Sequence, residues 1–81
     1  MKATVLVRPK QGILDPQGDA VGSSLRQLGF AVDEARVGRL VDVEIDGDDP
    51  AAARAELERM CEQLLANPLI ESYEIELVEG S

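Results

Sequence analysis

Histidine and tryptophan are absent from this sequence of 81 residues, and cysteine occurs once, as Cys61. A lone cysteine cannot close a disulfide within the chain, and no imidazole is available to activate its thiol. The sequence also shows no serine in a nucleophile-elbow context and no metal-like cluster of ligands. We therefore expect a buried, reduced thiol at Cys61, no catalytic residues and no metal site.

Aromatic residues are nearly as scarce, since Phe30 and Tyr73 are the only two. The core must be built from aliphatic side chains, and the larger of these contribute roughly 1.5 to 3 kcal/mol each when fully buried. A chain of this length buries only about 60% of the surface that it exposes when unfolded. Small domains commonly gain the missing contacts by oligomerising, so we expect a homodimer or a homotetramer.

Basic residues are half as numerous as acidic ones, 8 against 16, and the net charge is −8. This charge argues against nucleic acid as a partner, because binding a phosphate backbone requires lysine and arginine. Apolar runs fall far short of the roughly 18 residues that a membrane span needs, and the N-terminus has no signal-peptide core. We expect a cytoplasmic protein with a single domain over residues 1–81.

The first part of the chain is predicted to form a strand, a loop and a helix. Apolar and polar residues alternate over residues 2–8, until Pro9 removes a ladder donor. Residues 10–18, which include glycine and proline, form the loop. Apolar residues at helical spacing then predict a helix over residues 19–28, ended by Gly29.

Alternation continues over residues 31–46, and two interpretations of it remain open. The segment is either two antiparallel strands separated by a turn at Gly38 or one long, bent strand with a bulge there. We favour two strands, because one strand over the whole segment would be far longer than the usual five or six residues.

A second helix is predicted over residues 50–66, because Asp49 can cap it and Pro50 suits its first position. Asn67 and Pro68 should end it. Its inward face comprises Ala53, Leu57, Met60, Cys61, Leu64 and Leu65. The last strand follows, with Tyr73, Ile75 and Leu77 on one face and Glu74 and Glu76 on the other. The order β-α-β-β-α-β predicts an α+β two-layer sandwich, in which an antiparallel sheet carries two helices on one face.

The loop over residues 10–18 resembles a phosphate cradle only superficially. Its glycine spacing matches neither nucleotide-binding pattern, and Asp15 would repel a phosphate. We expect this loop to dock a protein partner instead, through Lys10, Gln11, Gly12, Asp15, Pro16, Gln17 and Gly18.

Arg36, Gly38 and Arg39 form the second candidate docking element. Two long donors beside a glycine-exposed backbone suit a partner surface that carries carboxylates or carbonyls. Because valine is compatible with a strand, we expect Gly38→Val to damage assembly more than folding.

Three segments together resemble the PurS family, the small subunit of phosphoribosylformylglycinamidine synthase. They are VRPKQGILDPQGDAV followed by LRQLGF, then ARVGRLVDVEI, and finally LLANPLIESYEIEL, and they span nearly the whole chain in the family's order. The one departure noted is Arg39, where the family pattern has lysine; this keeps the charge but changes the hydrogen-bond geometry.

The resemblance implies a PurS-like fold and a non-catalytic role in de novo purine biosynthesis. PurS-like subunits bridge a glutaminase, PurQ, and a synthetase, PurL, which converts formylglycinamide ribonucleotide to the formylglycinamidine with ammonia from glutamine. ATP and Mg²⁺ would be bound by the synthetase, with no cofactor in this chain and no activity expected from it alone. The alternative is a small dimeric regulatory domain that binds an amino acid or a nucleotide close to Gly12, Gly18 and Gly38.

Overall fold

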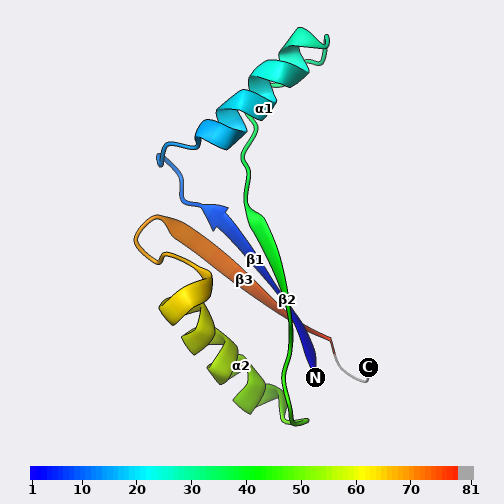
Figure 1. Ribbon diagram of the computed structural model, residues 1–81, viewed down its shortest axis with the longest axis vertical. Helices are drawn as coiled ribbons and strands as arrows, with labels where there is room; N and C mark the ends of the chain where they lie inside the picture. Colours follow the sequence, from blue (N-terminus) through cyan, green and yellow to red (C-terminus); the bar gives the residue numbers. More distant parts are fainter. Residues whose placement is uncertain (79–81) are drawn as a thin grey trace.

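A computed structural model describes residues 1–78 and shows one antiparallel sheet with two helices, one packed against the sheet and one beyond its end (Figure 1). Within these residues the elements are β1 (Lys2–Pro9), α1 (Pro16–Gln27), β2 (Arg39–Glu44), α2 (Pro50–Met60), the π-helical turn η1 (Cys61–Leu65) and β3 (Glu71–Val78). The sheet order is β2-β1-β3, so the N-terminal strand is central. Val5 pairs with Val41 on one side and with Ile75 on the other.

The core lies between the sheet and α2, and it uses the residues that the alternation predicts. Ala3, Val5 and Val7 point from the central strand towards Leu57 and Cys61, and all five are buried. The cysteine is a free thiol, and burial raises its pKa. The predicted location of Cys61 on the inner face of the second helix is therefore confirmed.

Both ends of the second helical segment follow the predicted signals. Asp49 accepts a hydrogen bond from the backbone N–H of Ala51 at 3.1 Å, and Pro50 occupies the first turn. At the other end the helix changes from α to π geometry, because the N–H of Ala66 donates to the carbonyl of Cys61, five residues earlier. The wider turn places Cys61 and Ala66 together in the core before Asn67 ends the helix.

Helix α1 begins three residues earlier than predicted because Asp15 is its N-cap. Its carboxylate accepts the N–H of Gly18 at 2.9 Å, and Pro16 takes the first helical position. The C-terminal end is as predicted: Gly29 adopts a φ of +98°, while Phe30 donates its N–H to the carbonyl of Leu25. This is a Schellman motif, which favours glycine at that position.

The α+β class and the antiparallel sheet are confirmed, but two details differ from the expectation. Between residues 31 and 46 the structure contains one strand, Arg39–Glu44, and not two. Residues 32–37 instead run along α1, where the small Gly18 and Gly22 allow Ala35 to approach closely. Only α2 covers the sheet, whereas α1 extends beyond its end (Figure 1). We call α1 together with residues 30–37 the arm.

Candidate docking site

The loop over residues 10–18 connects β1 to the arm and is tied to the loop that precedes β3. The backbone N–H of Lys10 donates to the carbonyl of Ile70 at 2.9 Å, and its ammonium donates to the carbonyl of Pro68 at 2.7 Å. Gly12 adopts a φ of +82°, which glycine tolerates without strain. Gln11 and Gln17 are exposed. This loop is therefore shaped by the chain's own contacts and presents two glutamines to solvent.

Asp15 joins the two chain segments at the base of the arm, the one that enters α1 and the one that leads to β2. One carboxylate oxygen caps α1 at Gly18, and the other accepts the backbone N–H of Val37 at 2.9 Å. The hydrogen bonds from Val37 and Gly18 lower the pKa of Asp15. On the same arm, the guanidinium of Arg26 donates to the carbonyl of Val32 at 3.1 Å. Asp15 thus holds the arm together. Its place before a helix is consistent with the cap at Gly18, but it gave no sign of the bond to Val37.

Gly18 and Gly38 are both required by close approach of the backbone. A Cβ added at Gly18 would collide with the carbonyl oxygen of Ala35, and one added at Gly38 would collide with that of Val7. The second contact corrects the expectation for Gly38: valine there would damage folding first, because a backbone carbonyl cannot move aside as a side-chain end can.

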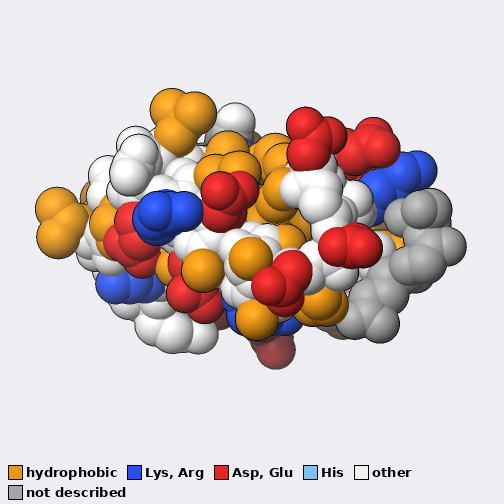
Figure 2. Space-filling view, turned by 90° about the horizontal axis from the view of Figure 1, so that it is seen from below, with side chains coloured by type: hydrophobic (Ala, Val, Ile, Leu, Met, Phe, Trp, Pro, Cys, Tyr) orange, Lys and Arg blue, Asp and Glu red, His pale blue; other side chains and the backbone are white. Residues whose placement is uncertain are grey.

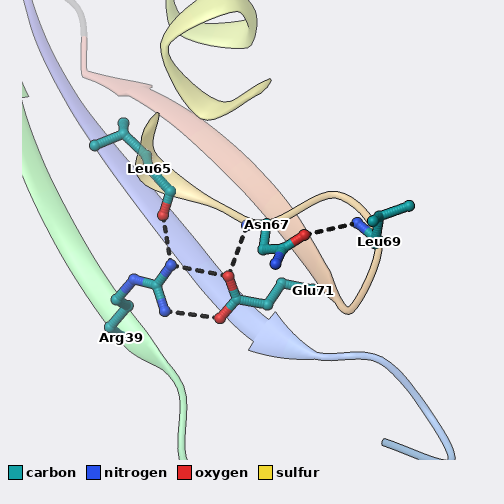
Figure 3. Close-up of polar contacts among 5 residues, drawn as sticks. All are labelled: Arg39, Leu65, Asn67, Leu69 and Glu71. Carbon is teal, nitrogen blue, oxygen red and sulfur yellow. Dashed lines mark hydrogen bonds and ion pairs between the residues drawn. The ribbon is translucent and has the colours of Figure 1, made fainter. Parts of the chain in front are cut away.

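Arg39 is bound within the chain (Figure 3). Its guanidinium donates to both carboxylate oxygens of Glu71, at 2.7 and 2.9 Å, and to the carbonyl of Leu65 at 2.6 Å. The same carboxylate accepts the N–H of Asn67 at 2.7 Å, and the side chain of Asn67 accepts the N–H of Leu69. These bonds join β2 to the end of η1 and to the start of β3.

The Arg39–Glu71 pair explains why arginine occurs at this position. A planar guanidinium can hold both carboxylate oxygens and a carbonyl at once, whereas an ammonium offers a single point of charge. The pair raises the pKa of Arg39 and lowers that of Glu71, whose carboxylate also accepts the bond from Asn67. Glu71 was not among the predicted docking residues, because no local pattern pairs it with Arg39, which lies 32 positions earlier.

A groove of about 410 Å³ lies where the arm meets the sheet, and we call it the arginine groove. Its lining comprises Leu6, Val7, Arg8, Pro9, Arg36, Gly38, Arg39 and Leu40. It brings the second predicted docking element together with the end of β1. The first element, residues 10–18, lies outside the lining.

Among residues 1–78, no three histidine, cysteine, aspartate or glutamate side chains form a group that could hold a metal ion. No helix in the same part of the chain is long and apolar enough to cross a membrane.

Comparison with known proteins gives the same family over the whole fold. The family model described as PurS, phosphoribosylformylglycinamidine (FGAM) synthase, matches residues 2–79. Relatives named phosphoribosylformylglycinamidine synthase subunit PurS include one from Synechocystis, 44% identical, with 95% of this chain and 78% of the relative covered. Another, from Methanocaldococcus jannaschii, is 39% identical, with 94% and 93% covered.

Solved structures agree with the sequence comparison. PurS of Methanocaldococcus jannaschii superposes with a TM-score of 0.85 at 36% identity, covering 99% of this chain and 98% of that one. A chain in the structure of PurLQS from Thermotoga maritima has a TM-score of 0.86 at 28% identity, with 95% of each chain covered. From the matched residues and the shared fold, this chain belongs to the PurS family of FGAM synthase subunits.

Proposed function

We propose that this chain is a non-catalytic assembly subunit that bridges a PurL-like synthetase and a PurQ-like glutaminase in de novo purine biosynthesis, in the cytoplasm. The observation that carries the proposal is the likeness, over nearly the whole chain, to one chain in the structure of PurLQS from Thermotoga maritima. A small domain of this kind contributes surfaces, and the two larger subunits contribute the chemistry.

The chemistry of ammonia gives such a bridge its purpose. Ammonia released by the glutaminase is protonated in water and then ceases to be a nucleophile, so transfer between sites that exclude water preserves it. In this proposal the synthetase binds ATP, Mg²⁺ and the nucleotide substrate, formylglycinamide ribonucleotide. ATP activates the amide oxygen of that substrate by phosphorylation, and ammonia displaces it as phosphate to give formylglycinamidine ribonucleotide and ADP.

Docking is assigned to the two elements that the sequence analysis singled out, with their roles divided. Lys10, Gln11, Gln17 and Arg36 are exposed and available to a partner. Gly12, Asp15, Pro16, Gly18, Gly38 and Arg39 give the loop, the arm and the sheet their shape through the contacts described above. The second group therefore supports docking by positioning the first.

We further propose that copies of the chain associate through the arm, as a homodimer or homotetramer. The radius of gyration is 15.9 Å, against about 11.7 Å for a compact chain of this length. The accessible surface is 5839 Å², about 1,100 Å² more than a folded monomer of this mass exposes. On the arm, Val21, Leu28 and Phe30 are 43%, 74% and 59% exposed. The excess surface is larger than the roughly 800 Å² per partner that a stable interface buries, so association of copies through the arm would account for it and cover these side chains.

Reconstitution of the enzyme tests the bridging role. Glutamine-dependent and ammonia-dependent amidation are measured with the PurL-like and PurQ-like subunits of the same organism, with and without this chain, together with the mass of the mixture. We expect the chain to restore glutamine-dependent amidation and to enter a large complex. No change in either activity or mass would refute the proposal.

A further inference from the structure

The inner face of β2, which is the face turned towards α2, is only half covered. Val41, Val43 and Ile45 lie on this face, and all three are partly buried against the core. α2 packs chiefly over β3, whereas β2 lies at the opposite edge of the sheet (Figure 1). Within residues 1–78 no second helix packs beside α2, because α1 extends beyond the sheet. A row of aliphatic side chains is therefore left without a helix over it.

The complementary surface is on α1. Val21, Leu25 and Leu28 recur along one side of the helix. Val21 and Leu28 are 43% and 74% exposed, so this side lacks cover within its own chain. A helix of 12 residues is about 18 Å long, and a strand of six residues is about 20 Å long. The apolar side of α1 therefore matches the uncovered face of β2 in length and in chemistry.

Both connections between the arm and the sheet hold α1 away from the β2 of its own chain. On the entering side, the N–H of Lys10 donates to the carbonyl of Ile70 at 2.9 Å. On the returning side, Gly38 packs closely against the carbonyl of Val7. Asp15 then bonds the two segments to each other. A helix that covers the inner face of β2 must therefore come from another molecule.

The charge distribution is compatible with a second copy as that molecule. Two copies repel each other overall, because each carries a net charge of −8. Residues 10–30, however, contain two basic and two acidic side chains, so the loop and α1 carry no net charge. At the end of the molecule away from the arm, acidic side chains are instead spread between apolar ones (Figure 2). Approach of α1 to another copy thus adds no repulsion of its own.

We propose that two copies exchange arms, so that α1 of each copy packs on the inner face of β2 of the other copy, beside α2. This inference rests on the proposed association through the arm and names the surface that receives it. A twofold axis repeats the contact, so the exchange closes at two copies. The excess surface of each copy, about 1,100 Å², is sufficient for such an interface. Each sheet then carries two helices on one face, as the element order predicts, but one of them comes from the other chain.

Two threonine substitutions on opposite faces of β2 test which face the second copy covers. Val43→Thr places a hydroxyl on the inner face, and Leu40→Thr places one on the open face, where Leu40 is 57% exposed. Threonine suits a strand at both positions. Sedimentation measures the dissociation constant between copies, and circular dichroism verifies folding. We expect Val43→Thr to weaken self-association by about tenfold or more, because it buries a hydroxyl in both halves of the interface. Leu40→Thr should stay within about threefold of the wild type.

A spin label on the arm locates the contact without changing an apolar side chain. Gln27→Cys provides the attachment point, because Gln27 is exposed on α1. The native Cys61 is buried and does not compete for the label. The labelled chain is refolded together with nitrogen-15-labelled wild type, so that only contacts between copies broaden amide resonances. We expect the strongest broadening at residues 41–45, and the reduced, diamagnetic label serves as the control.

The outcomes distinguish this inference from the proposals on which it rests. Strongest broadening within α1 would show that arms pair with each other, so association through the arm stands and the exchange is wrong. Equal weakening by Val43→Thr and Leu40→Thr, or an associated wild type without broadening at residues 41–45, also overturns the exchange. A wild type that sediments as a monomer refutes both the exchange and self-association. The bridging role is decided separately by the reconstitution described above.

Discussion

Replacement of Arg39 by lysine is the most direct test of the contacts in Figure 3. The change keeps the positive charge but removes the fork that holds both oxygens of Glu71 and the carbonyl of Leu65. Hydrogen bonds to charged groups contribute about 1.5 to 3 kcal/mol. The side chain of Arg39 is 49% exposed and that of Glu71 is 16% exposed. Because exposure to solvent weakens such pairs, we expect Arg39→Lys to destabilise the fold by about 1 to 2 kcal/mol.

Urea unfolding followed by circular dichroism measures this loss at a fixed protein concentration, since self-association also contributes to stability. A chain of this size unfolds with a dependence of about 1 kcal/mol per molar urea, so the midpoint should fall by about 1 to 2 M. Arg54→Lys, on the exposed surface of α2, serves as the control and should change the free energy of unfolding by less than about 0.5 kcal/mol.

A double-mutant cycle with Glu71→Gln separates the pair from other effects of the substitutions. If the two residues act together, their coupling free energy should lie in the range of about 0.5 to 3 kcal/mol found for contacting side chains. A coupling of zero, with an unchanged midpoint for Arg39→Lys, would show that Arg39 is an ordinary surface charge. The connection of β2 to η1 and β3 would then need another explanation.

Three further predictions follow from the pKa of Glu71, the position of Gly38 and the apolar face of the arm. The pKa of Glu71 is lowered from 4.5 in the folded chain. The stabilisation by its ionised carboxylate is therefore fully present above pH 4.5 and is lost as the pH falls through the lowered pKa of the folded chain. Urea titrations should show the free energies of unfolding of the wild type and Glu71→Gln converging below that pKa. Gly38→Val should cost about 1 to 3 kcal/mol, because its side chain meets the carbonyl of Val7. Leu28→Asp and Phe30→Asp should reduce the mass in sedimentation to that of a monomer while circular dichroism stays unchanged, because both side chains are exposed on the arm.

Each of these predictions has a result that would contradict it. A constant difference between wild type and Glu71→Gln down to pH 3 would show that ionisation of Glu71 does not stabilise the fold. Normal stability of Gly38→Val combined with lost assembly would restore the docking role first expected for that glycine. An unchanged mass for both aspartate variants would exclude the arm as the contact between copies.

Local patterns in the sequence were sufficient for much of the fold. The alternation of Ala3, Val5 and Val7 predicted the central strand, and Asp49 with Pro50 predicted the start of α2. Gly29 predicted the end of α1. Each of these signals acts over a few neighbouring residues, because side-chain periodicity and helix capping depend on the backbone close by. The PurS family was identified from the order of three family-like segments, which is also a property of the sequence alone.

Only the tertiary structure decided which distant groups meet. Residues 31–37 alternate like a strand, but Asp15 and the small residues of α1 hold them on the arm, away from the sheet. Arg39 was expected from the sequence to face a partner, but β3 brings Glu71 within 2.9 Å of its guanidinium. A glycine pattern alone did not reveal that Gly38 faces a carbonyl of β1. These pairings join residues more than ten positions apart. Hydrophobic periodicity carries no information about such contacts, because it records which face a residue takes and not its partner.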